Sequence, residues 1–220
     1  MAIRRTFATL ACVLLLAGCG GSSSTSTTNS QTTGTSATQT TPPTTGPKGF
    51  EGVAIESGTD LASPGTTRTH TVDGITCAPS EALVYHIHAH LQVFVAGTPR
   101  ALPGGIGIPG SRIVQTVAGP VAFGGQCIYW LHTHAPDGII HVESPKQRVY
   151  TLGNFFDVWH QALSSSHVGA ASGKVTALVS GKPWARDVRS IPLIPHAVIQ
   201  LSVGTPVVPF NNFSWTGLRL

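Results

Sequence analysis

The segment 84–95 constrains the fold of this 220-residue chain more than any other, because histidine alternates with apolar residues along it. His86, His88 and His90 occupy every second position, and apolar residues lie between them. Successive side chains of a β-strand point to opposite faces of its sheet. We therefore expect a strand that turns one apolar face to a core and displays three imidazoles on the other face.

A second histidine array is expected on a β-hairpin. Residues 127–134 and 139–143 flank Asp137-Gly138, a dipeptide typical of two-residue hairpin turns. Alternation along the two strands gathers one set of polar side chains on a single face: His132, His134, His141 and Glu143. The apolar residues between them then form the core face, as in the first array.

The length of the connection decides which side chains face each other across this hairpin. A two-residue turn places His134 opposite His141 and His132 opposite Glu143. A four-residue loop places His132 opposite His141 and keeps the same face, whereas a three-residue loop with a bulge breaks the pattern. Directly opposed side chains have Cβ atoms about 4.5–5.5 Å apart, which is within reach of joint metal ligation.

The two arrays are expected to meet around a transition-metal ion. Imidazole is a ligand for zinc, copper, iron and nickel, and the carboxylate of Glu143 or Asp137 can add an oxygen. We expect copper or zinc, with iron or nickel as further possibilities, bound by His86, His88, His90, His132, His134, His141 and Glu143. Neither array has zinc-finger or HExxH spacing. The alternative is a metal-free histidine face that titrates near neutral pH.

The two cysteines of the expected domain lie close to the histidine arrays. Cys77 precedes the first array, and Cys127 opens the strand of the second. Thiols outside the cytoplasm usually pair, so a disulfide between these two residues is predicted. Alternation puts Cys127 on the core face, which argues against thiolate ligation; free thiols remain a further alternative.

The rest of the domain predicts an α+β fold with more strand than helix. Apolar residues fall at helical spacing after Thr151, a favourable N-cap residue, so the main helix is expected over about 152–163. The 25 glycines and 16 prolines favour short strands joined by turns. The other expected elements are an irregular arm over 50–75, a hairpin turn over 96–99, a loop over 103–110 and strands over 175–179 and 197–203.

The N-terminus predicts export. Arg4 and Arg5 precede an apolar stretch that has the length of a signal-peptide core and is shorter than the roughly 20 residues that span a bilayer. The Ser/Thr-rich stretch that follows lacks apolar periodicity and is typical of a disordered tether. The expected organisation is a signal peptide over 1–18, a lipidated cysteine and tether over 19–47, and a single histidine-rich domain over 48–220.

The motif Leu16-Ala17-Gly18-Cys19 resembles the lipobox of bacterial lipoproteins. The resemblance implies cleavage before Cys19, a diacylglyceryl thioether on its sulfur and acylation of the new N-terminus. It also implies that a lipid anchor holds the protein on the extracytoplasmic face of a cell membrane. An ordinary secretory peptide with a cysteine at this position is the alternative.

Two further resemblances concern the domain. Exported bacterial proteins contain runs similar to His86–Leu91, Trp130–His134 and Gly138–Ser144, and this similarity implies no particular activity. The order of elements over 127–204 resembles the β-grasp (ubiquitin-like) family, on the basis of the second hairpin and of segments 150–152, 177–182, 191–193 and 199–201. That family implies a helix across one face of a mixed sheet whose two end strands are neighbours. A fold by itself implies no function.

Three functions agree with these features. A non-catalytic lipoprotein that captures or passes on copper or zinc is favoured, because nitrogen ligands are abundant and no nucleophile is obvious. A hydrolytic or redox metalloenzyme would add an open metal position and use Glu143, Asp137 or Glu81 as general base. A metal-free module would bind a protein or glycan. Nucleic acid is not an expected partner, because loss of Arg4 and Arg5 with the signal peptide would leave 11 of the 13 basic residues, scattered along the chain, against 9 acidic ones.

Overall fold

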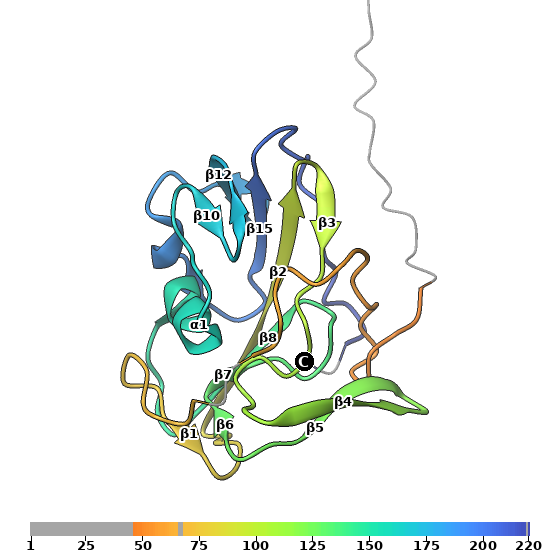
Figure 1. Cartoon of the computed structure of the whole chain (residues 1–220), viewed down its shortest axis with the longest axis vertical. Coiled ribbons are helices and arrows are strands. Elements are labelled where there is room, and N and C mark those ends of the chain that lie inside the picture. Colours follow the sequence, from red (N-terminus) through yellow and green to blue (C-terminus); the bar gives the residue numbers. More distant parts are fainter. Residues whose placement is uncertain (1–45, 66–67, 219) are drawn as a thin grey trace, which may run out of the picture. The chain divides into compact units, whose positions relative to one another are not determined.

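The longest strand of the computed structural model, β2 (Tyr85–Val95), lies at the centre of a seven-stranded mixed sheet (Figure 1). Its first half pairs antiparallel with β8 (Ile139–Ser144), and its second half pairs in parallel with β15 (Val198–Val203). Further strands complete the sheet: β7 (Leu131–His132) beside β8, β12 (Val175–Val179) and β13 (Lys182–Pro183) beyond β15, and β3 (Thr98–Arg100) beside the end of β2. A mixed sheet combined with a helix confirms the expected α+β class.

The structure describes residues 46–65, 68–218 and 220. The predicted signal peptide over 1–18, the lipidation site Cys19 and most of the tether over 19–47 therefore lie outside the described residues. Among the residues that are described, no helix has both the length and the apolar character needed to cross a membrane.

The helix α1 (Leu152–Trp159) begins where the sequence predicts. The Thr151 hydroxyl accepts the backbone N–H of Asn154, and the Asn154 side chain accepts the backbone N–H of Thr151, which together form a capping box. The helix ends at Trp159 rather than near Leu163, because His160 takes the left-handed conformation (φ 61°) and closes the helix as its C-cap. Leu163 instead forms an isolated β-bridge with Val168.

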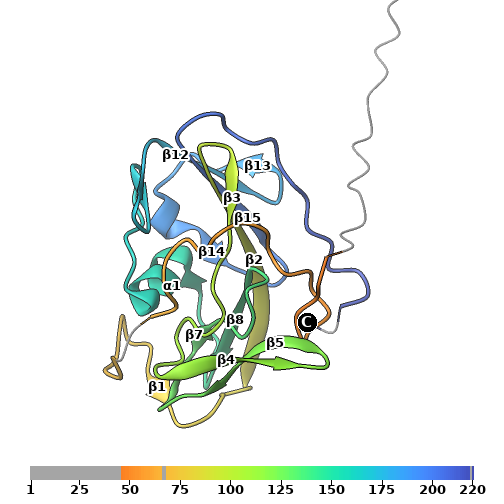
Figure 2. The same cartoon turned by 45° about the vertical axis from the view of Figure 1, so that its right-hand side comes forward.

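Short strand pairs surround the main sheet. They are β1 (Cys77–Ala78) with β6 (Ile128–Tyr129), β4 (Ser111–Thr116) with β5 (Gly119–Gly124), β9 (Tyr150–Thr151) with β14 (Pro192–Leu193), and β10 (His167–Val168) with β11 (Ala171–Ser172); a 3-10 turn, η1, spans Val188–Ser190. The β4–β5 hairpin lies next to the end of β7 (Figure 2), where the Ala122 N–H donates to the His134 carbonyl at 2.7 Å. The β4–β5 hairpin was not predicted from the sequence, because its side chains are half-buried or exposed and show no apolar alternation.

The alternation of β2 produces the expected core face. Ala89, Leu91 and Val93 are buried in one apolar cluster with the aromatic residues of α1, Phe155 and Phe156. The opposite face was expected to display its polar side chains, but most of them are buried as well: His88, His90, Gln92, His132, His141, Glu143, Gln200 and Ser202. The sheet therefore has a buried polar face as well as a buried apolar face.

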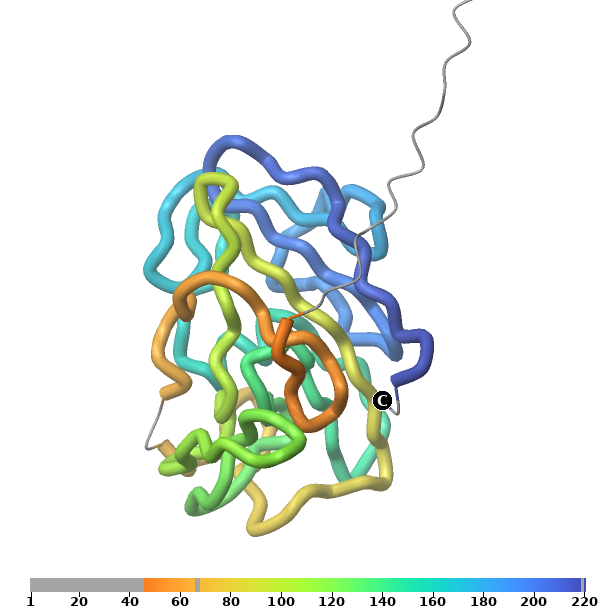
Figure 3. Tube along the Cα trace, turned by 90° about the vertical axis from the view of Figure 1, so that its right-hand side faces the viewer, coloured from red at the N-terminus to blue at the C-terminus, as the bar shows by residue number. Residues whose placement is uncertain are grey.

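Two segments from the ends of the described chain cover the polar face. Glu51, from the arm that precedes β1, reaches His141, and Phe213, from the segment after β15, stacks on His90. The Asn211 side chain also donates to the Gln92 amide oxygen at 3.1 Å. Figure 3 looks onto this side of the molecule, with the arm in orange and the C-terminal segment in dark blue. The described residues of the arm, 50–65 and 68–75, are largely irregular, as predicted.

The two expected hairpins have different outcomes. The first hairpin is confirmed: Val95 pairs with Thr98, and Ala96 and Gly97 form the turn with positive φ angles of 48° and 78°. In the second hairpin, the strand predicted over 127–134 is divided into β6 and β7. Its division follows from its partners, since β6 pairs with β1 whereas β7 pairs with β8.

The β-grasp arrangement expected over 127–204 is not confirmed. Helix α1 does pack against the core face of the mixed sheet. The neighbours of β15, however, are β12 and the parallel strand β2, and β2 precedes the segment on which the resemblance rests.

The carboxyl group of Glu56, on the arm, links folding stability to pH. Its Oε2 accepts the Leu102 N–H at 2.8 Å. Burial of the carboxyl group raises its pKa to about 8. The hydrogen bond from Leu102 lowers the pKa by less than burial raises it, and the charges of Asp137 and Asp60 raise it slightly further. The folded-state pKa lies above the ordinary value of 4.5, so the folded protein favours the protonated carboxyl group more than the unfolded chain does. The contribution of Glu56 to the free energy of unfolding is therefore fully present below about pH 4.5 and is lost as the pH rises through about 8.

We expect Glu56→Gln to raise the free energy of unfolding, relative to the wild type, more at about pH 9 than at about pH 5. The amide removes the titration and retains an oxygen that can accept the Leu102 N–H. Urea unfolding at the two pH values measures the difference. Asp187→Asn, which replaces an exposed carboxylate by an amide, controls for the loss of one negative charge. Equal effects of Glu56→Gln at both pH values would contradict the prediction.

Candidate metal centre

The strand register brings three histidines into one row across the sheet. His88 of β2 lies directly opposite His141 of β8, and His141 lies opposite His132 of β7. In the adjacent row, His86 lies opposite Glu143. The sequence left two strand registers open for the second hairpin, and the structure has the one in which His132 faces His141. Residues 133–138 connect the two strands, in place of the two-residue turn.

Thr133 explains the longer connection. Its N–H donates to the Ile106 carbonyl and its carbonyl accepts the Gly105 N–H, so its backbone pairs with the 103–110 loop instead of with β8. Its hydroxyl also donates to the Pro103 carbonyl at 2.8 Å. The loop thereby holds the end of β7 and removes the residues after His132 from the ladder.

The first candidate ligand group is His86, His88, His141 and Glu143. The Nε2 atoms of His86 and His88 are 3.0 Å apart, and Glu143 Oε1 lies 3.1 Å from His86 Nε2. The same oxygen lies 3.4 Å from His141 Nδ1. Two nitrogens bound to one tetrahedral zinc ion are about 3.3 Å apart, so these spacings match those of ligands that share an ion.

The second candidate ligand group is His132, His134, His141 and Glu143. The Nε2 atoms of His132 and His134 are 3.1 Å apart, and Glu143 Oε2 lies 3.8 Å from His132 Nε2. His132 Nδ1 lies 2.8 Å from the Tyr129 carbonyl oxygen, which can only accept, so Nδ1 carries the proton. The lone pair of His132 is therefore on Nε2 and points at the group, an arrangement typical of metal-ligating histidines.

Burial keeps three of these imidazoles neutral. It lowers the pKa of His88 to about 3 and that of His134 to about 4, and it also lowers the pKa of His132; in each case the neighbouring His141 adds to the effect. Metal ligation requires the neutral form. At neutral pH these side chains therefore offer free lone pairs.

His141 has the opposite electrostatic environment. Although burial lowers its pKa, the carboxylates of Glu143 and Glu51 outweigh that effect and raise the pKa to about 9. Glu51 Oε1 lies 3.0 Å from His141 Nε2. A positive charge is thus favoured at the position of His141, and a metal ion bound there can supply it in place of the proton.

Several buried polar atoms of the cluster have no hydrogen-bond partner. They are Nδ1 and Nε2 of His141, Oε2 of Glu143 and Oε2 of Glu51. The contacts of His141 with the two carboxylates are thus ion pairs without hydrogen-bond geometry. An unpaired buried polar atom costs about 1–3 kcal/mol, and coordination of a metal ion removes that cost. The residues present therefore fit a bound ion.

His90 and Asp137, both expected near the metal, are in neither group. His90 lies opposite Ile139, and its Nε2 is 3.1 Å from the Asp137 backbone oxygen. Its ring stacks on Phe213 with centroids 3.8 Å apart. The Asp137 side chain accepts the Ile139 N–H at 3.2 Å. The structure thus brings His86, His88, His132, His134, His141 and Glu143 together and leaves His90 beside them.

Two further carboxylates reach the cluster from outside the sheet. Glu51 contacts His141 from the arm, where the sequence shows no periodicity or motif that would single it out. Glu81, from the loop between β1 and β2, lies 3.4 Å from His134 Nε2 and so approaches the second array rather than the first. Burial, together with the charge of Glu143, raises the pKa of Glu81.

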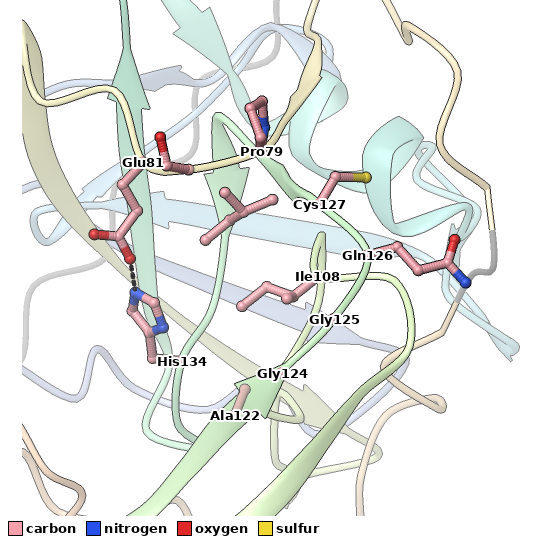
Figure 4. Close-up of a pocket in the computed structure, with 11 residues that line it drawn as sticks. Pro79, Glu81, Ile108, Ala122, Gly124, Gly125, Gln126, Cys127 and His134 are labelled. Carbon is pink, nitrogen blue, oxygen red and sulfur yellow. Dashed lines mark ion pairs between the residues drawn. The ribbon is translucent and has the colours of Figure 1, made fainter.

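A cavity of about 340 Å³ lies beside the second group. Glu81 and His134 face each other at one side of it, and Ile108, Ala122 and Gln126 are among the residues that line the rest (Figure 4). The cavity adjoins one edge of the histidine cluster and has the volume to hold a small molecule.

The predicted disulfide between Cys77 and Cys127 is present. It links β1 to the residue before β6, next to the pairing of Cys77 with Tyr129. Both sulfurs are therefore committed to the bond and neither belongs to a ligand group.

Comparison of the chain with protein-family models, with curated proteins and with solved structures finds no match.

Gly107 supports His132 by close contact. It has φ +72°, and a Cβ at this position would lie 2.3 Å from the Leu131 carbonyl oxygen and 3.1 Å from His132 Cβ. We expect Gly107→Ala to lower the free energy of unfolding by at least about 2 kcal/mol more than Gly124→Ala does, because it adds a clash to the backbone strain. Gly124 is the matched control, with φ +78° and no atom within 4 Å of its Cβ. Urea unfolding checks this; similar losses in both variants would contradict the close packing.

Proposed function

We propose that this protein is a lipid-anchored extracytoplasmic lipoprotein that binds a transition metal, copper or zinc, for metal capture or handling. The observation that carries the metal proposal is the pair of histidine and carboxylate groups that share His141 and Glu143. Their nitrogens converge, are largely buried and include atoms without any hydrogen-bond partner. A structural histidine face would leave such a cost uncompensated.

The donor set supports copper or zinc over magnesium and calcium. Five imidazoles and one carboxylate form the two groups, and the cysteines nearest them are joined in a disulfide. Neutral nitrogen donors suit copper(II) and zinc, whereas magnesium and calcium prefer oxygen ligands. Iron and nickel also accept imidazole, so metal analysis decides among these elements.

The proposed location rests on the lipobox-like motif at Leu16–Cys19 and on the apolar stretch that precedes it. The Cys77–Cys127 disulfide supports an oxidising compartment, because such bonds are rare in the cytosol.

A metalloenzyme is the second candidate function, and the cavity beside His134 favours it. A small molecule in that cavity would lie next to the second ligand group, with Glu81 at the same side as a possible general base. The raised pKa of Glu81, caused first by burial, brings it closer to the range in which a base works at neutral pH.

Metal analysis of the purified full chain tests the proposed function. We expect the detergent-solubilised wild-type protein to retain copper or zinc after dialysis. The triple variant His88→Ala/His132→Ala/His141→Ala removes one histidine from each of the three strands. It should therefore lose at least 90 per cent of the bound metal, roughly a tenfold loss of occupancy. Inductively coupled plasma mass spectrometry gives the amounts. His70→Ala/His167→Ala removes two exposed histidines outside the cluster and should retain the metal. A wild-type protein that binds none of zinc, copper, iron and nickel would overturn the metal proposal and favour a metal-free binding module.

Lipidation is tested independently through Cys19. Growth with a clickable palmitate analogue should label the wild type and the Cys12→Ser variant, whereas Cys19→Ser should carry no label. Cys12 is the matched control because it lies within the expected signal peptide. Label that persists in Cys19→Ser, or that is absent from the wild type, would contradict a lipid anchor at this residue.

A further inference from the structure

The candidate ligands outnumber the positions around one ion. Zinc in proteins is almost always four-coordinate in structural sites and has three protein ligands in catalytic sites. The cluster offers five imidazoles and the two oxygens of Glu143, arranged as two groups of four residues rather than as one. A single ion could not be bound by both histidine pairs and His141 at once, so some of these candidate ligands would not be used.

The Glu143 carboxylate divides the ligands between two positions. Its Oε1 lies 3.1 Å from His86 Nε2, which is beside His88, whereas its Oε2 lies 3.8 Å from His132 Nε2, which is beside His134. Each carboxylate oxygen thus lies near one histidine of a different pair, and Oε1 also lies 3.4 Å from His141 Nδ1. A carboxylate placed in this way can bridge two metal ions, which in proteins are about 3.5–4 Å apart.

We infer that the centre holds two metal ions bridged by Glu143, one bound by His86 and His88 and the other by His132 and His134. The inference rests on the proposed metal-binding function and specifies its stoichiometry. His141 belongs to both groups, and both of its ring nitrogens are buried and lack a hydrogen-bond partner, so it can serve either ion.

The two positions differ in their access to solvent. The His86 side chain is 39% exposed, whereas the His132 side chain is 0% exposed and that of His134 is 14% exposed. Because His86 is the most exposed of the candidate histidines, we expect the ion at the His86–His88 position to be the exchangeable one. The cavity beside His134 also adjoins the His132–His134 position, but the complete burial of His132 is expected to retain that ion longer. A lipoprotein that captures and passes on metal would transfer the first ion.

Metal stoichiometry in the full chain is the first test. After loading with zinc and removal of free ions, we expect two equivalents in the wild type, one in His86→Ala/His88→Ala and one in His132→Ala/His134→Ala. His70→Ala/His167→Ala should keep two. One equivalent in the wild type, lost entirely in either paired variant, would overturn the two-ion centre and leave the metal-binding function intact. No bound metal in the wild type would overturn both.

Electron paramagnetic resonance of the wild-type protein loaded with copper(II) tests the bridge without relying on variants that could fail to fold. Two copper ions linked through Glu143 are expected to couple, so the signal per copper falls to less than about half of that of the same protein loaded with one equivalent. Two equivalents with full, uncoupled signals would overturn the shared carboxylate.

Release of zinc to a chelator tests the difference in access. We expect two kinetic phases separated by at least tenfold in rate, with the fast phase absent from His86→Ala/His88→Ala. A single phase in the wild type would overturn the division into an exchangeable and a retained ion.

Discussion

The backbone register that joins β2, β8 and β7 positions all the ligands of the two candidate groups except His134, which follows β7. The hydrogen bonds of these ladders place His88, His141 and His132 in one row without any metal. A slip of one residue in either ladder would turn the imidazoles of that strand into the apolar core. The apolar cluster on the other face opposes such a slip, because it would expose residues such as Leu91 and Ile140 to the polar face. The same packing that stabilises the fold thus also fixes the site.

Burial of a polar sheet face is costly unless its groups are paired. The protein meets this need locally around Gln200, whose side chain donates to the Val208 and Pro209 carbonyls and accepts the Asn211 N–H. Around His141 and Glu143 it does not, and buried atoms of both residues remain without hydrogen-bond partners. The contrast between the paired side chain of Gln200 and the unpaired atoms of His141 and Glu143 is the physical reason to expect an ion beside the latter two.

Local periodicity was enough to predict the two-faced strands. The residue type of Thr151 predicted the helix cap, and the expected export of the protein predicted the disulfide. Periodicity could not select the hairpin register, because that depends on Thr133 bonding to the 103–110 loop. It also could not separate His90 from His88, which share one alternation; only the sheet shows that His90 lies opposite Ile139 and beyond the histidine row. Glu51 was missed because it reaches the site through the tertiary placement of an irregular arm.

The measurement that tests the central claim most directly is anomalous X-ray diffraction from crystals of the metal-loaded protein, recorded at the absorption edge of the metal. We expect anomalous peaks on the polar face of the sheet, between Glu143 and the histidine pairs of β2 and of the β7 end. Peaks confined to the protein surface, or a histidine cluster that shows none after loading with copper or zinc, would contradict this expectation.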